Sequence, residues 1–312
     1  MRVLSKETHF RFMARRGAAT IFSAIAIVGS IVAFLLNGLN LGIEFTGGVE
    51  FEAGYSEPVD VDAVRQQLAD AGYTDAQVIY FGTQRDIMIR IPPSEESDGT
   101  ELREALLSVL QQTAPDVESR SFSVVFPQIG GEVAEAGSLA MIFVLIMIFI
   151  YIMFRFQWRF SAGAVAALAH DVIITVGLFA LFQFPVDSSV IAALLAVIGY
   201  SLNDTVVVFD RIRENFLSLR GEEPDGVIDR SINQMLARTI ITGVTTLLVL
   251  TALLVLGGES VRSFSIALIA GIVIGTYSSI YVASAVALQL GVSARDLLPP
   301  EPVDGDEIDE LP

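Results

Sequence analysis

The chain has 312 residues, of which 53% are hydrophobic, and a formal net charge of −17 at pH 7. This hydrophobic share is typical of a membrane protein and excludes an ordinary soluble domain. Because the sequence has no cysteine and two histidines, it excludes disulfides and thiolate or histidine-rich metal sites, and its acidic balance argues against nucleic-acid binding. We expect no cofactor.

The first element in chain order is a basic segment followed by an apolar run. Residues 1–16 carry five basic side chains and one acidic side chain, and residues 17–36 form an apolar run of 20 residues. The run is long enough to span a membrane and lacks a convincing cleavage site, so it predicts an anchor that is retained. The basic residues before it predict a cytoplasmic N-terminus.

Residues 37–135 carry 18 acidic and 5 basic side chains, which predicts a domain in water. Apolar and polar residues alternate over 43–53, the pattern of a half-buried strand. Helical spacing follows in 61–71 and 98–114. Further strands are predicted at 77–81, 86–91 and 117–126. This β-α-β-β-α-β order predicts a ferredoxin-like α+β sandwich whose first and last strands are antiparallel neighbours.

Five more apolar runs predict a membrane domain over residues 136–292. They lie at 137–154, 162–184, about 190–209, 240–256 and 264–290. A basic stretch, about 210–238, predicts a cytoplasmic connector between the fourth and fifth runs. Thirteen of the 19 Lys and Arg residues then lie on the cytoplasmic side. The sequence therefore predicts a polytopic α-helical protein with six transmembrane helices, both termini inside and the small domain outside. The acidic tail, 293–312, is predicted to be disordered in the cytoplasm.

The strongest candidate for chemistry is Asp204, which lies within the fourth run between Asn203 and Thr205. A charged side chain in a span costs about 2.5–3.5 kcal/mol on insertion scales, so it usually faces a protein interior or a water path and marks function. Low dielectric favours the neutral carboxyl, which suits a proton relay. The alternative is a structural lock in which Asp204 pairs with a neighbouring polar group, and the residues alone leave both open.

Other polar residues in the spans are candidates beside Asp204. Arg238 is a candidate for the relay itself, and the candidates for a supporting role are Asn203, Thr205, His170 and Asp171. Arg238 opens the fifth span, where it either anchors the helix at the interface or reaches Asp204 and holds it ionised until a proton releases the pair. His170 could pass protons, although a lone histidine is more often structural. Asp171 is expected to cap or pair locally.

Small residues recur at every fourth position of the sixth span. They are Ala267, Gly271, Gly275, Ser279, Ala283, Ala287 and Gly291. Such a stripe lets helix backbones approach closely. We favour helix packing within the chain, by Gly271, Gly275 and Ser279 above all, over a subunit interface.

Five segments together carry a resemblance to a known family. They are 41–48, 169–172, 197–205 with 210–214, 238–239 and 277–284. The sequence resembles the SecF family, the smaller membrane subunits of the SecD–SecF complex in the resistance–nodulation–division superfamily. The resemblance implies an inner-membrane protein that is not an enzyme. It would work with SecD, the SecYEG channel and a small YajC subunit, and use the proton-motive force to promote late steps of preprotein export. It also implies that Asp204 and Arg238 act in proton transport.

Two other functions are compatible with single features of the sequence. Asp171 and Asp204 would supply the pair of carboxyl groups that an intramembrane aspartyl protease needs. However, the neighbouring residues do not resemble the signatures of that class. A scaffold that only stabilises the translocation machinery is the second alternative, and it predicts that Asp204 tolerates a neutral replacement.

Overall fold

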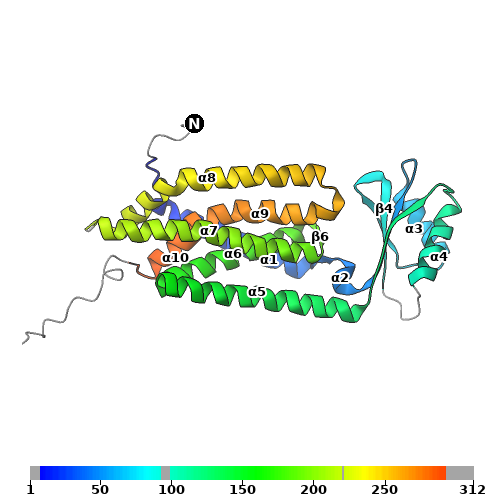
Figure 1. Cartoon of the computed structure of the whole chain (residues 1–312), viewed down its shortest axis with the longest axis horizontal. Helices are drawn as coiled ribbons and strands as arrows, with labels where there is room; N and C mark the ends of the chain where they lie inside the picture. The colour runs from blue at the N-terminus through cyan, green and yellow to red at the C-terminus, as the bar shows by residue number, and fades with distance from the viewer. Residues whose placement is uncertain (1–7, 93–98, 220, 293–312) are drawn as a thin grey trace, which may run out of the picture.

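The computed structural model describes residues 8–92, 99–219 and 221–292, and consists of a bundle of long helices with a small α+β domain at one end (Figure 1). Within these residues six helices are long and apolar enough to cross a membrane. The α+β domain lies between the first and second of them, which confirms the predicted fold class. The predicted tail, 293–312, and residues 1–7 of the predicted N-terminal segment lie outside the described residues.

The membrane-crossing helices are longer than the apolar runs that predict them. They are α1 (Arg16–Asn37), α5 (Pro127–Arg155), α6 (Trp158–Phe182), α7 (Ser188–Ser218), α8 (Pro224–Leu256) and α9 (Arg262–Ser278), the last continuing through a π turn (Ser279–Ala283) into α10 (Ser284–Gln289). Hydropathy marks only the apolar part of a helix, and hydrogen bonding continues into polar flanks. Most of the predicted connector, 210–238, is therefore helical, and α5 begins inside the segment predicted as the outer domain.

The outer domain has the predicted order of elements. They are β2 (Gly48–Gly54), α3 (Val61–Asp70), β3 (Gln77–Phe81), β4 (Thr83–Ile91), α4 (Gly99–Gln111) and β5 (Glu118–Val125). The sheet order is β3-β4-β2-β5 with every pair antiparallel, so the first and last strands, β2 and β5, are neighbours as predicted. Phe51, Leu68 and Leu106 are fully buried together and hold the sheet to α3 and α4.

The strand predicted from residue 43 begins only at Gly48, so its first part is wrong. Residues Ile43–Thr46 form a short helix, α2, and Phe45 packs with apolar side chains of the membrane helices. The alternation of apolar and polar residues over 43–53 therefore combines a part that packs on the membrane helices with a part that belongs to the sheet. Gly47 and Gly48 then turn the chain into β2 with φ of +71° and +122°, a region that favours glycine.

The chain before α1 is held by a polar stripe on α8. The stripe consists of Asp225, Asp229 and Asn233, spaced four residues apart and therefore on one helix face. The amide of Met13 donates to Asp229 at 2.8 Å, and the side chain of Asn233 bonds both the N–H and the carbonyl of Phe10. Asp225 pairs with Arg16. The N-terminal segment is thus fixed to a helix more than 200 residues away in sequence.

The small-residue stripe of the sixth span lies inside the bundle. All of its members except Gly291 are buried. A side chain built on Gly271 would overlap the side chain of Val197 on α7, and one on Gly275 would lie 3.1 Å from the Cβ atom of Ser201. The stripe therefore allows α9 to pack closely on α7, which is the arrangement that we favoured from the sequence.

This close packing makes a prediction for Gly271→Ala. We expect the substitution to lower the free energy of unfolding by about 1–3 kcal/mol, the usual cost of overpacking, because Val197 belongs to a filled core cluster. The measurement is thermal unfolding of the chain in detergent. Gly29→Ala on α1 is the matched control, since no atom lies within 4 Å of the added methyl group. An equal loss in both variants would contradict the packing argument.

Candidate functional site

A buried polar cluster joins α6, α7 and α9 in the middle of the bundle. Asp171 on α6 is completely buried, and its Oδ2 atom accepts hydrogen bonds from Ser201 on α7 at 2.6 Å and from Ser278 on α9 at 2.8 Å. Its Oδ1 atom lies 3.0 Å from His170 Nδ1. Asp171 therefore connects three helices. The sequence predicted that Asp171 caps or pairs locally, and this describes only its contact with His170.

The cluster lies between two apolar layers. Along α6, along α7, and along α9 with the π turn and α10 that continue it, the cluster separates two sets of core residues. One set contains Phe160 and Phe209, and the other contains Phe179 and Val197. An unmade hydrogen bond in such surroundings costs about 1–3 kcal/mol. The donors to Asp171 therefore fix how α7 and α9 are rotated about their axes.

The rotation of α7 decides where Asp204 lies. Ser201 and Asp204 are three residues apart on the helix and share its buried face. Asp204 is 5% exposed, and its Oδ2 atom is buried without a hydrogen-bond partner in the part of the chain that the structure describes. Asp171 and Asp204 are thus two buried carboxyl groups with opposite environments, one supplied with donors and one open to a proton or a new partner.

Arg238 lies on α8, which packs against α7, and it acts on Asp204 electrostatically. Arg238 is exposed. Among the described residues, its side chain and that of Asp204 share no hydrogen bond or ion pair. Asn203 is exposed as well, on the opposite side of the helix backbone from the buried face. Two strongly polar residues of the membrane region thus lie at the surface of the single chain.

The other predicted residues lie close to the cluster. Thr205 is fully buried, and neither its hydroxyl nor the Nε2 atom of His170 has a hydrogen-bond partner among the described residues. The His170 ring lies 6.0 Å from the ring of Tyr277, whose hydroxyl donates to the carbonyl of Ala19 at 2.8 Å. The polar region therefore extends from α7 across α6 and α9 to α1.

Sequence reasoning assigned no role to Ser278 or Tyr277, and it considered Ser201 only as a polar partner of Asp204, not of Asp171. Serine within a span has no distinctive signal, because its hydroxyl is usually satisfied by the preceding turn of its own helix. Only the contact of α6 with α7 and α9 shows that these two hydroxyls donate to one carboxylate. The sequence signals were the position of Ser201 next to Asp204 and the position of Ser278 within the small-residue stripe.

The donor set at the site is poor for a metal ion. The described residues hold no group of three or more His, Cys, Asp or Glu side chains arranged to bind one. Asp171 already receives hydrogen bonds at both oxygens, and the serines that donate to it are weak metal ligands. What the contacts show is helix packing, because the two serine hydroxyls that Asp171 accepts from lie on α7 and α9.

Comparisons with known proteins identify the family to which the chain belongs. The family model "Protein export membrane protein SecD/SecF, C-terminal" matches residues 105–293, and the model "SecD/SecF GG Motif" matches residues 32–59. The protein translocase subunit SecF of Vibrio alginolyticus is 45% identical over 99% of both chains. The SecF subunit of Haemophilus influenzae is 44% identical, over 96% of this chain and 91% of its own length.

A solved structure shows the same fold. The crystal structure of SecDF, a translocon-associated membrane protein from Thermus thermophilus, superposes with a TM-score of 0.82 and 35% identity. The match covers 91% of this chain and 39% of the Thermus chain. The chain therefore belongs to the SecD/SecF family of protein-export membrane proteins, and within it to the SecF translocase subunits.

Proposed function

We propose that this chain, a protein-export subunit by family, uses the proton-motive force to promote late steps of preprotein transfer across the inner membrane. The observation that supports this proposal is the contrast between the two buried carboxyl groups. Asp171 is held by donors from three residues, whereas Asp204 has a buried oxygen without a partner. A group with an open oxygen within a span is suited to take up and release a proton.

The proposed step is a change in the attraction between Asp204 and Arg238. While Asp204 is ionised, the guanidinium of Arg238 attracts it, and α7 and α8 are drawn together. A proton on Asp204 removes this attraction and lets the two helices shift. One charge crossing 100 mV supplies roughly 2.3 kcal/mol, and reversing a two-state population from 1:99 to 99:1 takes about 5.5 kcal/mol. One proton therefore biases the equilibrium, and several protons are needed for each complete stroke.

The exposed polar residues support an assembly in which a second membrane protein covers this face. A charged or amide side chain in a span rarely faces lipid, yet Arg238 and Asn203 are exposed in the single chain. SecD is the partner that we propose for this surface, because the solved relative is a SecDF chain. The SecYEG channel and YajC are proposed as further contacts, and preproteins in transit as the substrates.

The proposed orientation follows from the basic residues. Of the 19 Lys and Arg, 13 lie on the side with both termini and the α7–α8 turn, which we assign to the cytoplasm. Residues 37–135 are then periplasmic and residues 136–292 form the rest of the membrane domain. The acidic tail, 293–312, is cytoplasmic in this assignment.

The two alternative functions differ in their support. A protease is excluded by the family, whose members are non-enzymatic translocase subunits. A scaffold remains the second candidate, because Asp171 and its donors hold three helices together as a scaffold would require. The two predictions that follow separate proton coupling from scaffolding.

Asp204→Asn tests the coupling. We expect it to abolish the gradient-dependent part of preprotein completion in membrane vesicles, because an amide cannot carry the proton, while the complex remains assembled. The measurement is translocation with and without an imposed proton gradient at equal complex levels. Asp210→Asn, an exposed residue on the same helix, is the control and should leave the gradient dependence unchanged. Full gradient-dependent export in Asp204→Asn would favour the scaffold.

The double change Ser201→Ala, Ser278→Ala tests the structural role of Asp171. Loss of both hydroxyl donors should lower the free energy of unfolding by about 1–3 kcal/mol per donor, because the buried carboxylate is left short of partners. Thermal unfolding of the detergent-solubilised chain measures this loss, with Ser138→Ala, an exposed serine bonded within its own helix, as the control. If the double variant unfolds at the wild-type temperature, Asp171 does not hold the helices.

A further inference from the structure

The outer end of α7 is held by the segment that leads from α1 into the outer domain. Strand β1 (Asn40–Leu41) pairs in parallel with β6 (Pro185–Val186), which immediately precedes α7. The amide of Gly42 then donates to the carbonyl of Val186 at 2.8 Å. The pairing joins two loops that are about 145 residues apart, so the chain after α1 is fixed to the start of α7.

Glu44 adds a charged contact at the same place. Its Oε2 atom accepts a hydrogen bond from the amide of Ser188, the first residue of α7. The first amides of a helix have no partner within the helix, and a carboxylate near them interacts favourably with the helix dipole. Asp187 serves the amide of Val190 from within the same chain segment, whereas Glu44 reaches the helix from α2. Glu44 therefore ties α2 to the end of α7.

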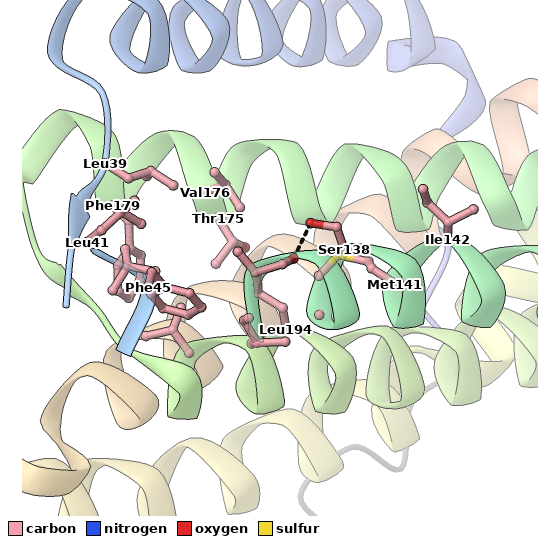
Figure 2. A pocket seen from close by; sticks show the side chains of 15 residues that line it. Leu39, Leu41, Phe45, Ser138, Met141, Ile142, Thr175, Val176, Phe179 and Leu194 are labelled. Atoms are coloured by element: carbon pink, nitrogen blue, oxygen red, sulfur yellow. Dashed lines mark hydrogen bonds between the residues drawn. The ribbon is translucent and has the colours of Figure 1, made fainter. Parts of the chain in front are cut away.

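The same short helix is pressed against α5. A methyl group added to Gly130 would lie 2.5 Å from the carbonyl oxygen of Phe45, so the glycine allows the backbones of α2 and α5 to meet. Phe45 lines an apolar cavity of about 440 Å³. Figure 2 shows Phe45 among the side chains around this cavity, with Leu194 of α7 and Met141 of α5 also on its walls. The α2 segment thus contacts both α5 and α7 at their outer ends.

Both attachments of the outer domain meet at this segment. Gly47 and Gly48 lead from α2 into β2, which lies in the interior of the sheet. Strand β5 pairs with β2, and α5 begins two residues after β5 ends. A displacement of α2 is therefore passed to the two adjacent strands by which the domain is joined to the membrane helices.

The helix between Asp204 and Ser188 is unbroken. At about 1.5 Å per residue, their 16-residue separation spans about 24 Å without a proline or a change of helix type. A tilt or axial shift of α7 at Asp204 therefore reaches Ser188 as a rigid movement.

We propose that Glu44 is a positioning residue that holds the root of the outer domain to the start of α7, so that movement of α7 is transmitted to the sheet. This inference rests on the proposed function, because it takes the movement of α7 from protonation of Asp204. The contacts made by Gly42, Glu44 and Phe45 stay closed throughout the cycle and move as one unit with α7.

Glu44→Ala tests the contact. We expect the gradient-dependent part of preprotein completion to fall about two- to fivefold, the factor that corresponds to loss of a charge at a helix N-terminus, at an unchanged complex level. Glu44→Gln should recover only part of the rate, because its amide oxygen can still accept from Ser188 but carries no charge to interact with the helix dipole. Glu57→Ala, at an exposed position of the outer domain, is the control and should have no effect.

A cross-link separates transmission from folding. Because the chain has no cysteine, Leu41→Cys with Val186→Cys would form one defined disulfide between β1 and β6, whose strands are paired at these positions. If β1 and β6 stay paired throughout the cycle, forming the disulfide in the otherwise native chain leaves export intact. In the Glu44→Ala background the disulfide restores export, and reducing it removes this rescue. The inference is overturned if the disulfide stops export in the otherwise native chain, or if it fails to restore export in Glu44→Ala.

Comparing the export assays of Asp204→Asn and Glu44→Ala also separates this inference from the proposed function. If Asp204→Asn loses gradient-dependent export and Glu44→Ala keeps the full rate, the inference about Glu44 is wrong and proton coupling stands. If Asp204→Asn keeps gradient-dependent export while Glu44→Ala loses it, the proposal of proton coupling at Asp204 is wrong. The transmission from Asp204 that we infer is then wrong as well.

Discussion

The membrane bundle depends on the hydrogen bonds that Ser201 and Ser278 donate to Asp171. These bonds are made where water cannot replace them, so each helix has one rotation in which its hydroxyl reaches the carboxylate. The absence of a side chain at Gly275 brings α9 close enough, since an added methyl would lie 3.3 Å from the Asp171 oxygen. A single buried carboxylate thus specifies the register of three helices that apolar packing alone would leave free to rotate.

The same register places the two buried aspartates, Asp171 on α6 and Asp204 on α7, in different environments. Ser201 faces Asp171, and Asp204 follows one turn later on the same helix face without a donor at its Oδ2 atom. Both serine donors go to the first carboxyl, and the bond from Ser201 fixes the face of α7 on which Asp204 lies. A structural site and a candidate relay are therefore adjacent because one positions the other, and mutations at the two should have separable effects on stability and coupling.

The sequence predicted the six spans and the order of the outer domain, because hydropathy and alternation are local signals. The functional role of Asp204 stays a prediction. The sequence did not predict that Ile43–Thr46 form a helix, since apolar residues that face a sheet and those that face a bundle look alike. It could not show that Ser201 and Ser278 serve one carboxylate, because this requires knowing which helices are neighbours. The pairing of Arg238 with Asp204 stays a prediction, and Arg238 is exposed in the single chain.

The polar stripe on α8 has a consequence for how the protein is made. The segment before α1 is fixed by Asp229 and Asn233, which are synthesised more than 200 residues later. Helices inserted in a bilayer first exist as independent units and then associate. The segment before α1 therefore meets its partner only after most of the chain has been synthesised. Its docking onto α8 is a late event of biogenesis, so a chain truncated before α8 would leave the N-terminal segment without its partner.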